Sequence, residues 1–144
     1  MQHLARSMML EGKYASQRCD DDRIAEMVCE YVDDDYNTRA CFLAVTSDNE
    51  IVGFFAAELV LYPFRRGLCL QDVALYVLPA FRGSTAAVRL IARMQEWAEA
   101  HGADEIAVCI SAPHDTTLAE SVYERLGFTK WGTLMRKELT HGRA

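Results

Sequence analysis

Apolar residues in the N-terminal part of the chain recur at the spacing of amphipathic helices. Residues 2–11 place Leu4 and Met8 one helical turn apart, and Gly12 follows, so we expect a short helix that Gly12 closes with a left-handed cap. The acidic run at residues 20–22 precedes a second stretch with apolar side chains at helical spacing. Carboxylates in this position cap free N–H groups and interact favourably with the helix dipole, so a second helix is predicted to begin there.

From residue 41 onward the pattern changes to apolar runs that are typical of β-strands. Runs rich in Val, Leu, Phe and Tyr cover residues 41–45, 51–61 and 68–78. Polar or turn-forming residues at 47–49 and 63–67 separate these runs. Short connections between consecutive strands predict an antiparallel meander of these strands.

Helical and extended patterns alternate in the C-terminal half of the chain. We predict a long helix at about residues 85–101, a buried strand at 106–110, a helix at about 116–126 and one or more closing strands at 128–139. This order predicts an α/β fold with a mixed, mostly antiparallel sheet, parallel only around the strand-helix-strand unit, and with helices on both faces. Ligands bind to such sheets at the carboxyl ends of parallel strands, which is where the turn after Leu78 lies.

The composition indicates one globular domain that covers residues 1–144. With 51% hydrophobic and 10% aromatic residues, the chain can bury a hydrophobic core without disulfide bonds or a structural metal ion. A net charge of -6 at pH 7 repels polyanions, so we expect neither nucleic acid nor an anionic membrane as the main partner. Any phosphate group that binds must therefore be held by local interactions.

The cysteines and the apolar runs favour a cytoplasmic protein. The chain has five cysteines, an odd number, and none of them forms a Cys-x-x-Cys pair, which argues against a disulfide framework and against a zinc site. No apolar run approaches the ~18 residues that span a bilayer, and the first residues lack the basic and then apolar order of a signal peptide. We expect a reducing compartment and no metal.

The turn that follows the third predicted strand is a candidate phosphate-binding site. A helix that begins directly after a strand presents unpaired backbone N–H groups and a partial positive charge, both of which attract phosphate. The glycine in this turn leaves room for a ligand to approach. An ordinary strand-to-helix turn that binds nothing is an equally good interpretation of this pattern alone. The candidate residues are Arg82, Gly83, Ser84, Thr85, Ala86 and Ala87.

Two segments resemble the signature segments of a known enzyme family. Residues 77–83 read Val-Leu-Pro-Ala-Phe-Arg-Gly, and residues 118–128 read Leu-Ala-Glu-Ser-Val-Tyr-Glu-Arg-Leu-Gly-Phe. Together and in this order they resemble the GNAT superfamily of acetyl-CoA-dependent N-acetyltransferases, and the resemblance covers about residues 20–139. It implies that the pattern Gln/Arg-x-x-Gly-x-Gly/Ala wraps the CoA pyrophosphate with backbone amides, and that Val77 and Leu78 hold the pantetheine arm.

One residue of the pyrophosphate motif departs from the family pattern. Arg82 occupies the first motif position and Ala87 the last, but Thr85 stands where the family usually has glycine. Threonine needs no forbidden dihedral angle in the first turn of a helix, and its hydroxyl can donate to a phosphate oxygen, so we expect weakened binding at most. Arg89 and Arg93, one helical turn apart, either reach the outer phosphate of the ligand or form a solvated surface pair.

Tyr123 and two carboxylates are the candidate catalytic residues. The resemblance implies that Tyr123 protonates the departing thiolate, whereas its helical spacing alone favours an aromatic residue of the core. Asp72 and Glu58 interrupt apolar strands, where a carboxylate is costly unless it faces a wet cleft, and the resemblance implies a carboxylate base in this region. We prefer Asp72, although a bulge would bring Gln71 inward instead, and His114 before the last helix is another titratable candidate.

These residues predict an enzyme that moves an acetyl group from acetyl-CoA to an amine of a small molecule or a protein. We expect direct attack in a ternary complex, without a metal or a covalent enzyme intermediate, because no cysteine has the His partner that a thiol route requires. The alternative is a non-catalytic CoA-binding or protein-interaction module with the same fold. No motif in the sequence names the acceptor.

The first predicted strand is expected at the edge of the sheet. The family that the chain resembles opens with a strand before its first helix, whereas this chain begins helically at Gln2. An apolar strand without a neighbour favours pairing with another chain. We therefore expect either a homodimer formed through residues 41–45 or a native first strand that precedes residue 1.

Overall fold

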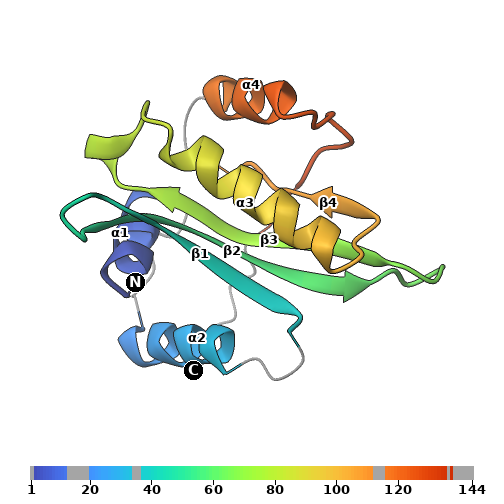
Figure 1. Ribbon diagram of the computed structural model, residues 1–144, viewed down its shortest axis with the longest axis horizontal. Helices are drawn as coiled ribbons and strands as arrows, with labels where there is room; N and C mark the ends of the chain where they lie inside the picture. The colour runs from blue at the N-terminus through green and yellow to red at the C-terminus, as the bar shows by residue number, and fades with distance from the viewer. Residues whose placement is uncertain (1, 13–19, 34–36, 112–115, 136, 138–144) are drawn as a thin grey trace.

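A β-sheet forms the middle layer of the protein, and helices cover both of its faces (Figure 1). The structure is a computed structural model that describes residues 2–12, 20–33, 37–111, 116–135 and 137. The strands, in chain order and in sheet order, are β1 (Arg39–Val45), β2 (Ile51–Leu61), β3 (Leu68–Val77) and β4 (Glu105–Ala107). The helices are α1 (Gln2–Glu11), α2 (Asp21–Val32), the short 3-10 helix η1 (Pro79–Phe81), α3 (Ala86–Ala100) and α4 (Thr117–Arg125). Within the described residues, no helix has the length and apolar character needed to cross a membrane.

The order and direction of the strands confirm the predicted fold class. β1, β2 and β3 form the antiparallel meander, and β4 pairs in parallel with β3 after the crossover through α3. β1 lies at the edge of the described sheet, as expected, and its Leu43 and Val45 are 42% and 52% exposed. α1 and α2 pack on one face of the sheet, whereas α3 and α4 pack on the other (Figure 1).

The alternating side chains of the strands build two separate cores. Phe55 of β2 points toward α3, where it packs with buried residues of that helix such as Met94. Phe54, the preceding residue, points to the opposite face and packs with Leu4 of α1. Both phenylalanines are 1% exposed, because β2 is covered on both faces. This double burial explains why β2 is an almost continuous apolar run rather than an alternating one.

The ends of the helices follow from local sequence, with one exception. Asp20 caps α2, because its Oδ1 accepts a hydrogen bond from Arg23 N–H at 3.0 Å. Gly102 follows α3 with a φ of +72°, the left-handed conformation that ends many helices. The left-handed cap predicted at Gly12 is wrong, since its φ is not positive. Its N–H donates to Met8 O at 2.9 Å, so this residue continues the hydrogen-bonding pattern of α1.

The C-terminal strands differ from the prediction. β4 covers only Glu105–Ala107 instead of residues 106–110, and it is not buried, because Ile106 is partly exposed between two exposed neighbours. In the predicted closing segment 128–139, residues 128–135 and 137 form no strand, and the other positions lie outside the described residues. Trp131 and Met135 of this segment are 99% and 90% exposed, so its apolar pattern alone did not give it a strand partner.

A β-bulge in β3 decides which side chains face α3. Ala56 of β2 is opposite Ala74, and the next residue, Ala57, is opposite Asp72, which leaves Val73 as an extra residue in β3. Residues opposite each other in a sheet share a face, and Ala57 belongs to the core under α3. The bulge therefore turns Asp72 toward the face that α3 and α4 cover.

Candidate functional site

The two parallel strands separate partway along β3. Their last paired residues are Gln71 in β3 and Ala107 in β4, whereas β3 continues along β2 to Val77. Within the described residues, β3 therefore has no strand partner on its β4 side from Asp72 onward. We call this point of separation the fork. An extended ligand with amide groups can pair with such an edge in place of a strand.

Asp72 lies at the fork and connects the two separating segments. Its Oδ1 accepts a hydrogen bond from Cys109 N–H at 2.8 Å, just beyond the end of β4. Asp72 is half-buried. Its negative charge adds to the effect of burial in raising the pKa of Tyr123 in α4. The structure thus brings together the preferred base and the tyrosine that the resemblance implies.

Tyr123 is positioned by the turn that ends α4 and by a contact with α3. Phe128 N–H donates to Tyr123 O at 3.0 Å, and Gly127, with a φ of +91°, lets the chain turn back. The rings of Tyr123 and Phe128 meet edge to face, with centroids 5.1 Å apart. Gln95 of α3 donates to Leu126 O at 3.3 Å and so joins the end of α4 to α3.

The environment of Tyr123 keeps its hydroxyl protonated. The residue is 8% exposed and belongs to the core under α3, so its ring has the packing role that spacing alone favours. Burial raises the pKa of Tyr123, and the negative charge of Asp72 adds to the rise. A phenol with a raised pKa holds its proton at neutral pH, and this hydroxyl is therefore a hydrogen-bond donor toward an anionic group.

Glu58 and Gln71 lie opposite each other on the other face of the sheet. Glu58 Oε1 accepts hydrogen bonds from Arg39 Nε at 3.2 Å and from Tyr31 O–H at 3.4 Å, next to α2. The bulge is the reason that these residues do not join the fork. It turns Asp72 toward α3, where unbroken alternation along the second half of β3 would have placed Gln71.

The turn at residues 82–87 combines a strained glycine with an ordinary threonine. Gly83 has a φ of +84°, which L side chains rarely adopt, and a Cβ built on it would meet no atom within 4 Å. Thr85 has a φ of -77° and a ψ of 0°, an allowed helical conformation. The threonine at the glycine position of the motif therefore costs no backbone strain, whereas the conformation of Gly83 requires glycine.

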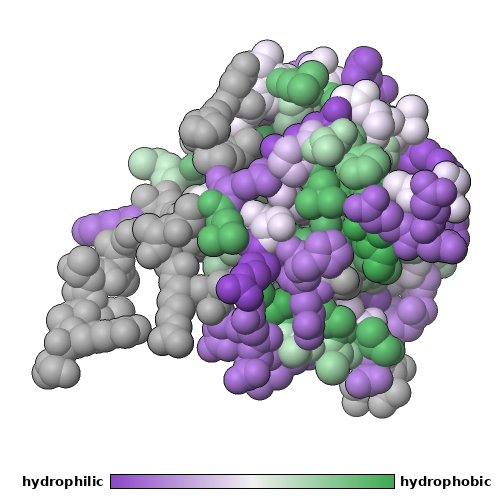
Figure 2. Space-filling model, turned by 90° about the vertical axis from the view of Figure 1, so that its left-hand side faces the viewer, coloured by the Kyte–Doolittle hydropathy of each residue, from purple (hydrophilic) through white to green (hydrophobic). Residues whose placement is uncertain are grey.

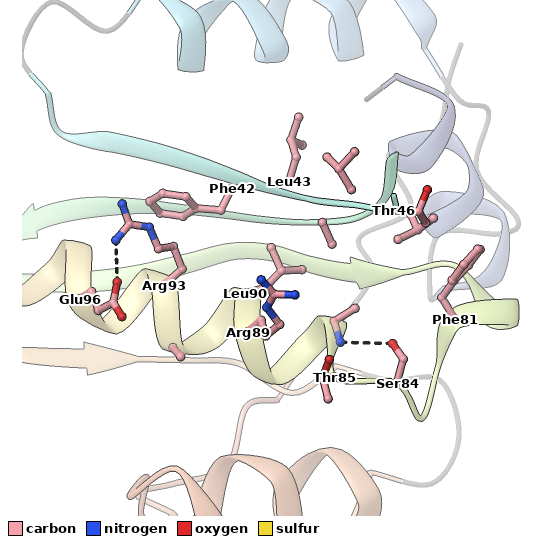
Figure 3. A pocket seen from close by; sticks show the side chains of 15 residues that line it. Phe42, Leu43, Thr46, Phe81, Ser84, Thr85, Arg89, Leu90, Arg93 and Glu96 are labelled. Atoms are coloured by element: carbon pink, nitrogen blue, oxygen red, sulfur yellow. Dashed lines mark hydrogen bonds and ion pairs between the residues drawn. The ribbon is translucent and has the colours of Figure 1, made fainter. Parts of the chain in front are cut away.

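The start of α3 presents backbone N–H groups. The first hydrogen bond of the helix runs from Arg89 N–H to Thr85 O at 2.9 Å, so earlier N–H groups have no acceptor within the helix. Ser84 Oγ accepts from Ala86 N–H at 3.2 Å, as Figure 3 shows. The remaining N–H groups and the helix dipole give this turn a partial positive charge.

The Arg82 side chain is bound by residues outside the turn. Its Nε donates to Val77 O at 3.0 Å, and its Nη2 forms an ion pair with Glu11 of α1 at 2.5 Å. Tyr76 O–H donates to the same carboxylate. Glu11 and Tyr76 were not predicted as site residues, because Glu11 lies 71 positions from Arg82 and no local pattern in the sequence connects them.

A pocket of about 690 Å³ lies between β1 and the start of α3 (Figure 3). Its lining includes the apolar residues Phe42 and Leu90 together with residues of the turn, but none of the three catalytic candidates. Arg89 and Arg93 also line it, and Arg93 forms an exposed ion pair with Glu96 at 2.5 Å. Because β1 and β4 are at opposite edges of the sheet, both arginines face away from the fork.

The turn and α1 lie at one end of the molecule. This end is on the left in Figure 1, where the connection between β1 and β2, the end of β3 and the start of α3 come together. Figure 2 shows the same end face on, with apolar side chains exposed among polar ones. A ligand that binds here meets apolar and polar contacts side by side.

Other candidate groups were also located. Among the described parts of the chain, no cluster of three or more His, Cys, Asp or Glu side chains is suited to a metal ion. Cys29, Cys69 and Cys109 are free cysteines. His114 lies outside the described residues, so its candidate role stays a prediction.

Several solved structures share this fold. A transcriptional regulator from Bacillus halodurans C-125 matches with a TM-score of 0.77 at 17% identity, over 96% of this chain and 93% of the other. The aminoglycoside N-acetyltransferase AAC(6')-Iy, solved in complex with CoA, matches with a TM-score of 0.73 at 23% identity, over 96% and 85%. Glucosamine-6-phosphate N-acetyltransferase from Arabidopsis thaliana matches with a TM-score of 0.71 at 12% identity, over 97% and 95%. At these identities the matches establish the fold alone.

The family assignment comes from the sequence. A search among curated proteins finds no significant match. The sequence model of the Acetyltransferase (GNAT) family, however, matches residues 4–128, a range that includes the fork, the turn and Tyr123. The sheet topology agrees with that of the structural relatives. The chain therefore belongs to the GNAT family of acetyltransferases.

Proposed function

We propose that this protein transfers the acetyl group of acetyl-CoA to an amine by direct attack in a ternary complex. The observation that carries the proposal is the meeting of Asp72 and Tyr123 on one face of the sheet, at the fork. Family membership supports acetyl transfer, and the structural relative solved with CoA supports the donor. Two structural relatives are named as N-acetyltransferases of an aminoglycoside and of glucosamine 6-phosphate, which favours a small-molecule amine over a protein amine as the acceptor.

Acetyl-CoA binds in this proposal along β3 and at the start of α3. The pyrophosphate lies against backbone N–H groups whose local positive potential offsets the net charge of -6. The pantetheine arm follows Val77 and Leu78 and pairs with the edge of β3 that β4 leaves. The residues of the turn that form the backbone cradle are Arg82, Gly83, Ser84, Thr85, Ala86 and Ala87.

The proposed reaction uses Asp72 as a base for the amine and Tyr123 as a hydrogen-bond donor to the leaving sulfur. Asp72 takes a proton from the amine, whose nitrogen attacks the thioester carbonyl, so that a C–N bond forms and the C–S bond breaks. Sulfur leaves with the electron pair of the C–S bond, and the Tyr123 hydroxyl donates a hydrogen bond to the resulting thiolate. The pKa of a phenol is already above that of a thiol, and burial raises the pKa of Tyr123 further. Hydrogen bonding to the thiolate is therefore the main contribution of Tyr123, and water completes the protonation. Glu58 is the second candidate base, but it lies on the other face.

The alternative function is a domain that binds CoA or a partner protein without catalysis. The two are separated by measuring thiol release from acetyl-CoA with a panel of amino sugars, polyamines and lysine-containing peptides. Turnover with any of these amines supports the enzyme, whereas tight CoA binding without turnover on the whole panel contradicts it. A homodimer formed through β1 and a cytoplasmic location stay predictions from the sequence.

The first prediction concerns the ligand site. CoA is expected to raise the melting temperature of the wild type by mass action, and Gly83→Glu is expected to abolish this rise, because a carboxylate there repels the pyrophosphate. Gly102→Glu is the matched control. Gly102 lies at the other end of α3, has a φ of +72° and likewise has no atom within 4 Å of a built Cβ. Equal CoA-induced shifts in both variants would place the site elsewhere.

The second prediction concerns the Tyr123 hydroxyl. Tyr123→Phe keeps the ring that packs on Phe128, so the melting curve and CoA affinity should change little. A lost hydrogen bond to a charged group costs about 1.5 to 3 kcal/mol, so kcat is expected to fall roughly ten- to a hundredfold. Tyr62→Phe, just after β2 and before β3, is the control and should keep full kcat. Unchanged kcat in Tyr123→Phe, with chemistry limiting the rate, contradicts the assignment.

The third prediction concerns the base. Asp72→Asn preserves an oxygen that can accept from Cys109 N–H, but it removes the proton acceptor. We expect kcat/KM to fall by about a hundredfold near neutral pH and the defect to shrink at high pH, where more of the amine is already neutral. The measurement is the pH profile of Asp72→Asn beside that of Glu58→Gln. If only Glu58→Gln shows the pH-dependent defect, Glu58 is the base instead.

A further inference from the structure

The Arg82 side chain forms a closed set of interactions that joins α1, β3 and the turn. Arg82 Nη2 and Tyr76 O–H bind the two oxygens of the Glu11 carboxylate, each at 2.5 Å. Arg82 Nε donates to Val77 O at 3.0 Å, and the guanidinium carbon lies 5.5 Å from the centroid of the Tyr76 ring. Nε and Nη2 of Arg82 are therefore engaged by Val77 and Glu11 rather than by the start of α3.

The place of Glu11 in α1 favours a specific role for this carboxylate. Glu11 is the last residue of α1, where the negative end of the helix dipole makes a carboxylate unfavourable. Desolvation also acts to raise the pKa of Glu11, but the hydrogen bonds from Tyr76 and Arg82 outweigh it, and the pKa is lowered. The carboxylate is thus stabilised by its partners in the turn and β3, against its local helical preference.

The packing of α1 fixes the position of Glu11. Leu4 is fully buried in the core that also contains Phe54 and Tyr76, so α1 is anchored to the sheet one face away from the fork. At the other end of the interaction, Val77 O belongs to the strand edge along which the pantetheine arm is proposed to bind. An isolated ion pair on the surface contributes little to folding stability, but the pair of Glu11 and Arg82 joins two anchored backbone segments.

We propose that Arg82 is a positioning residue, which α1 holds through Glu11 so that the turn and Val77 O keep the orientation that binds CoA. The inference rests on the proposed function, because it assumes that CoA binds at the turn. It differs from a role in which the Arg82 guanidinium contacts phosphate directly. The two roles predict opposite effects for Glu11→Gln, since removing a competing carboxylate would release Arg82 toward a phosphate.

The test compares CoA dissociation constants, measured by calorimetry, with kcat at saturating acetyl-CoA. Glu11→Gln and Arg82→Gln are each expected to weaken CoA binding about threefold to thirtyfold, and Glu11→Gln is expected to leave saturated kcat unchanged. The double variant should bind no more weakly than Arg82→Gln alone, because both substitutions break the same connection. Asp21→Asn is the control, because it removes another exposed ion pair of α1, that with Arg6 at 3.1 Å, and it should bind CoA as the wild type does.

The outcomes separate this inference from the proposed function. Unchanged or tighter CoA binding by Glu11→Gln, beside normal binding by the wild type, overturns the positioning role alone. A wild type that does not bind CoA overturns the proposed function and this inference with it. Should Glu11→Gln fail to fold, Tyr76→Phe carries the test, because it keeps the ring and removes only the hydrogen bond to Glu11. This variant should weaken CoA binding at least twofold, and unchanged binding would contradict the role.

Discussion

The separation of β3 from β4 after Gln71 and Ala107 creates the proposed site. Had the strands remained paired, the backbone of β3 beyond Asp72 would be satisfied on both sides and closed to a ligand. Because the pairing ends early, one edge of β3 is left to be paired by something else, and the bulge at Val73 turns a carboxylate toward the same place. α4 then brings a protonated tyrosine over the fork, held there by its own terminal turn and by α3.

The electrostatics of the protein follow from the same arrangement. A chain with a net charge of -6 does not attract an anionic donor at long range, so recognition depends on the backbone dipoles at the start of α3. Arg82, which precedes this helix start, forms an ion pair with Glu11. Arg89 and Arg93 line the pocket toward β1, which Ser84, Thr85 and Ala86 of the turn also line. Oriented N–H groups at the start of α3 provide local positive potential in the proposed phosphate site.

The features that the sequence predicted are those with local causes. The meander, α3 and the cap at Asp20 depend on apolar runs, turn residues and side chains within a few positions of one another, and the structure confirms them. Features that depend on pairing between distant segments were missed or wrong. The alternative in which a bulge brings Gln71 inward was wrong, because the bulge turns Asp72, the preferred residue, toward the fork face. β4 ended early, and the described part of the closing segment has no strand partner. The contact between Glu11 and Arg82 joins the first helix to the turn and leaves no pattern in the sequence.

Amide hydrogen exchange, measured with and without acetyl-CoA, tests most directly that the donor binds at the fork and the turn. The account predicts slower exchange in residues 72–78 of β3 and at the start of α3, residues 83–88. These two segments contain the strand edge and the N–H groups that the ligand would cover. Protection confined to residues 42–46 of β1 and residues 89–96 of α3, without protection of residues 72–78, would place the ligand in the pocket between β1 and α3 and contradict the account.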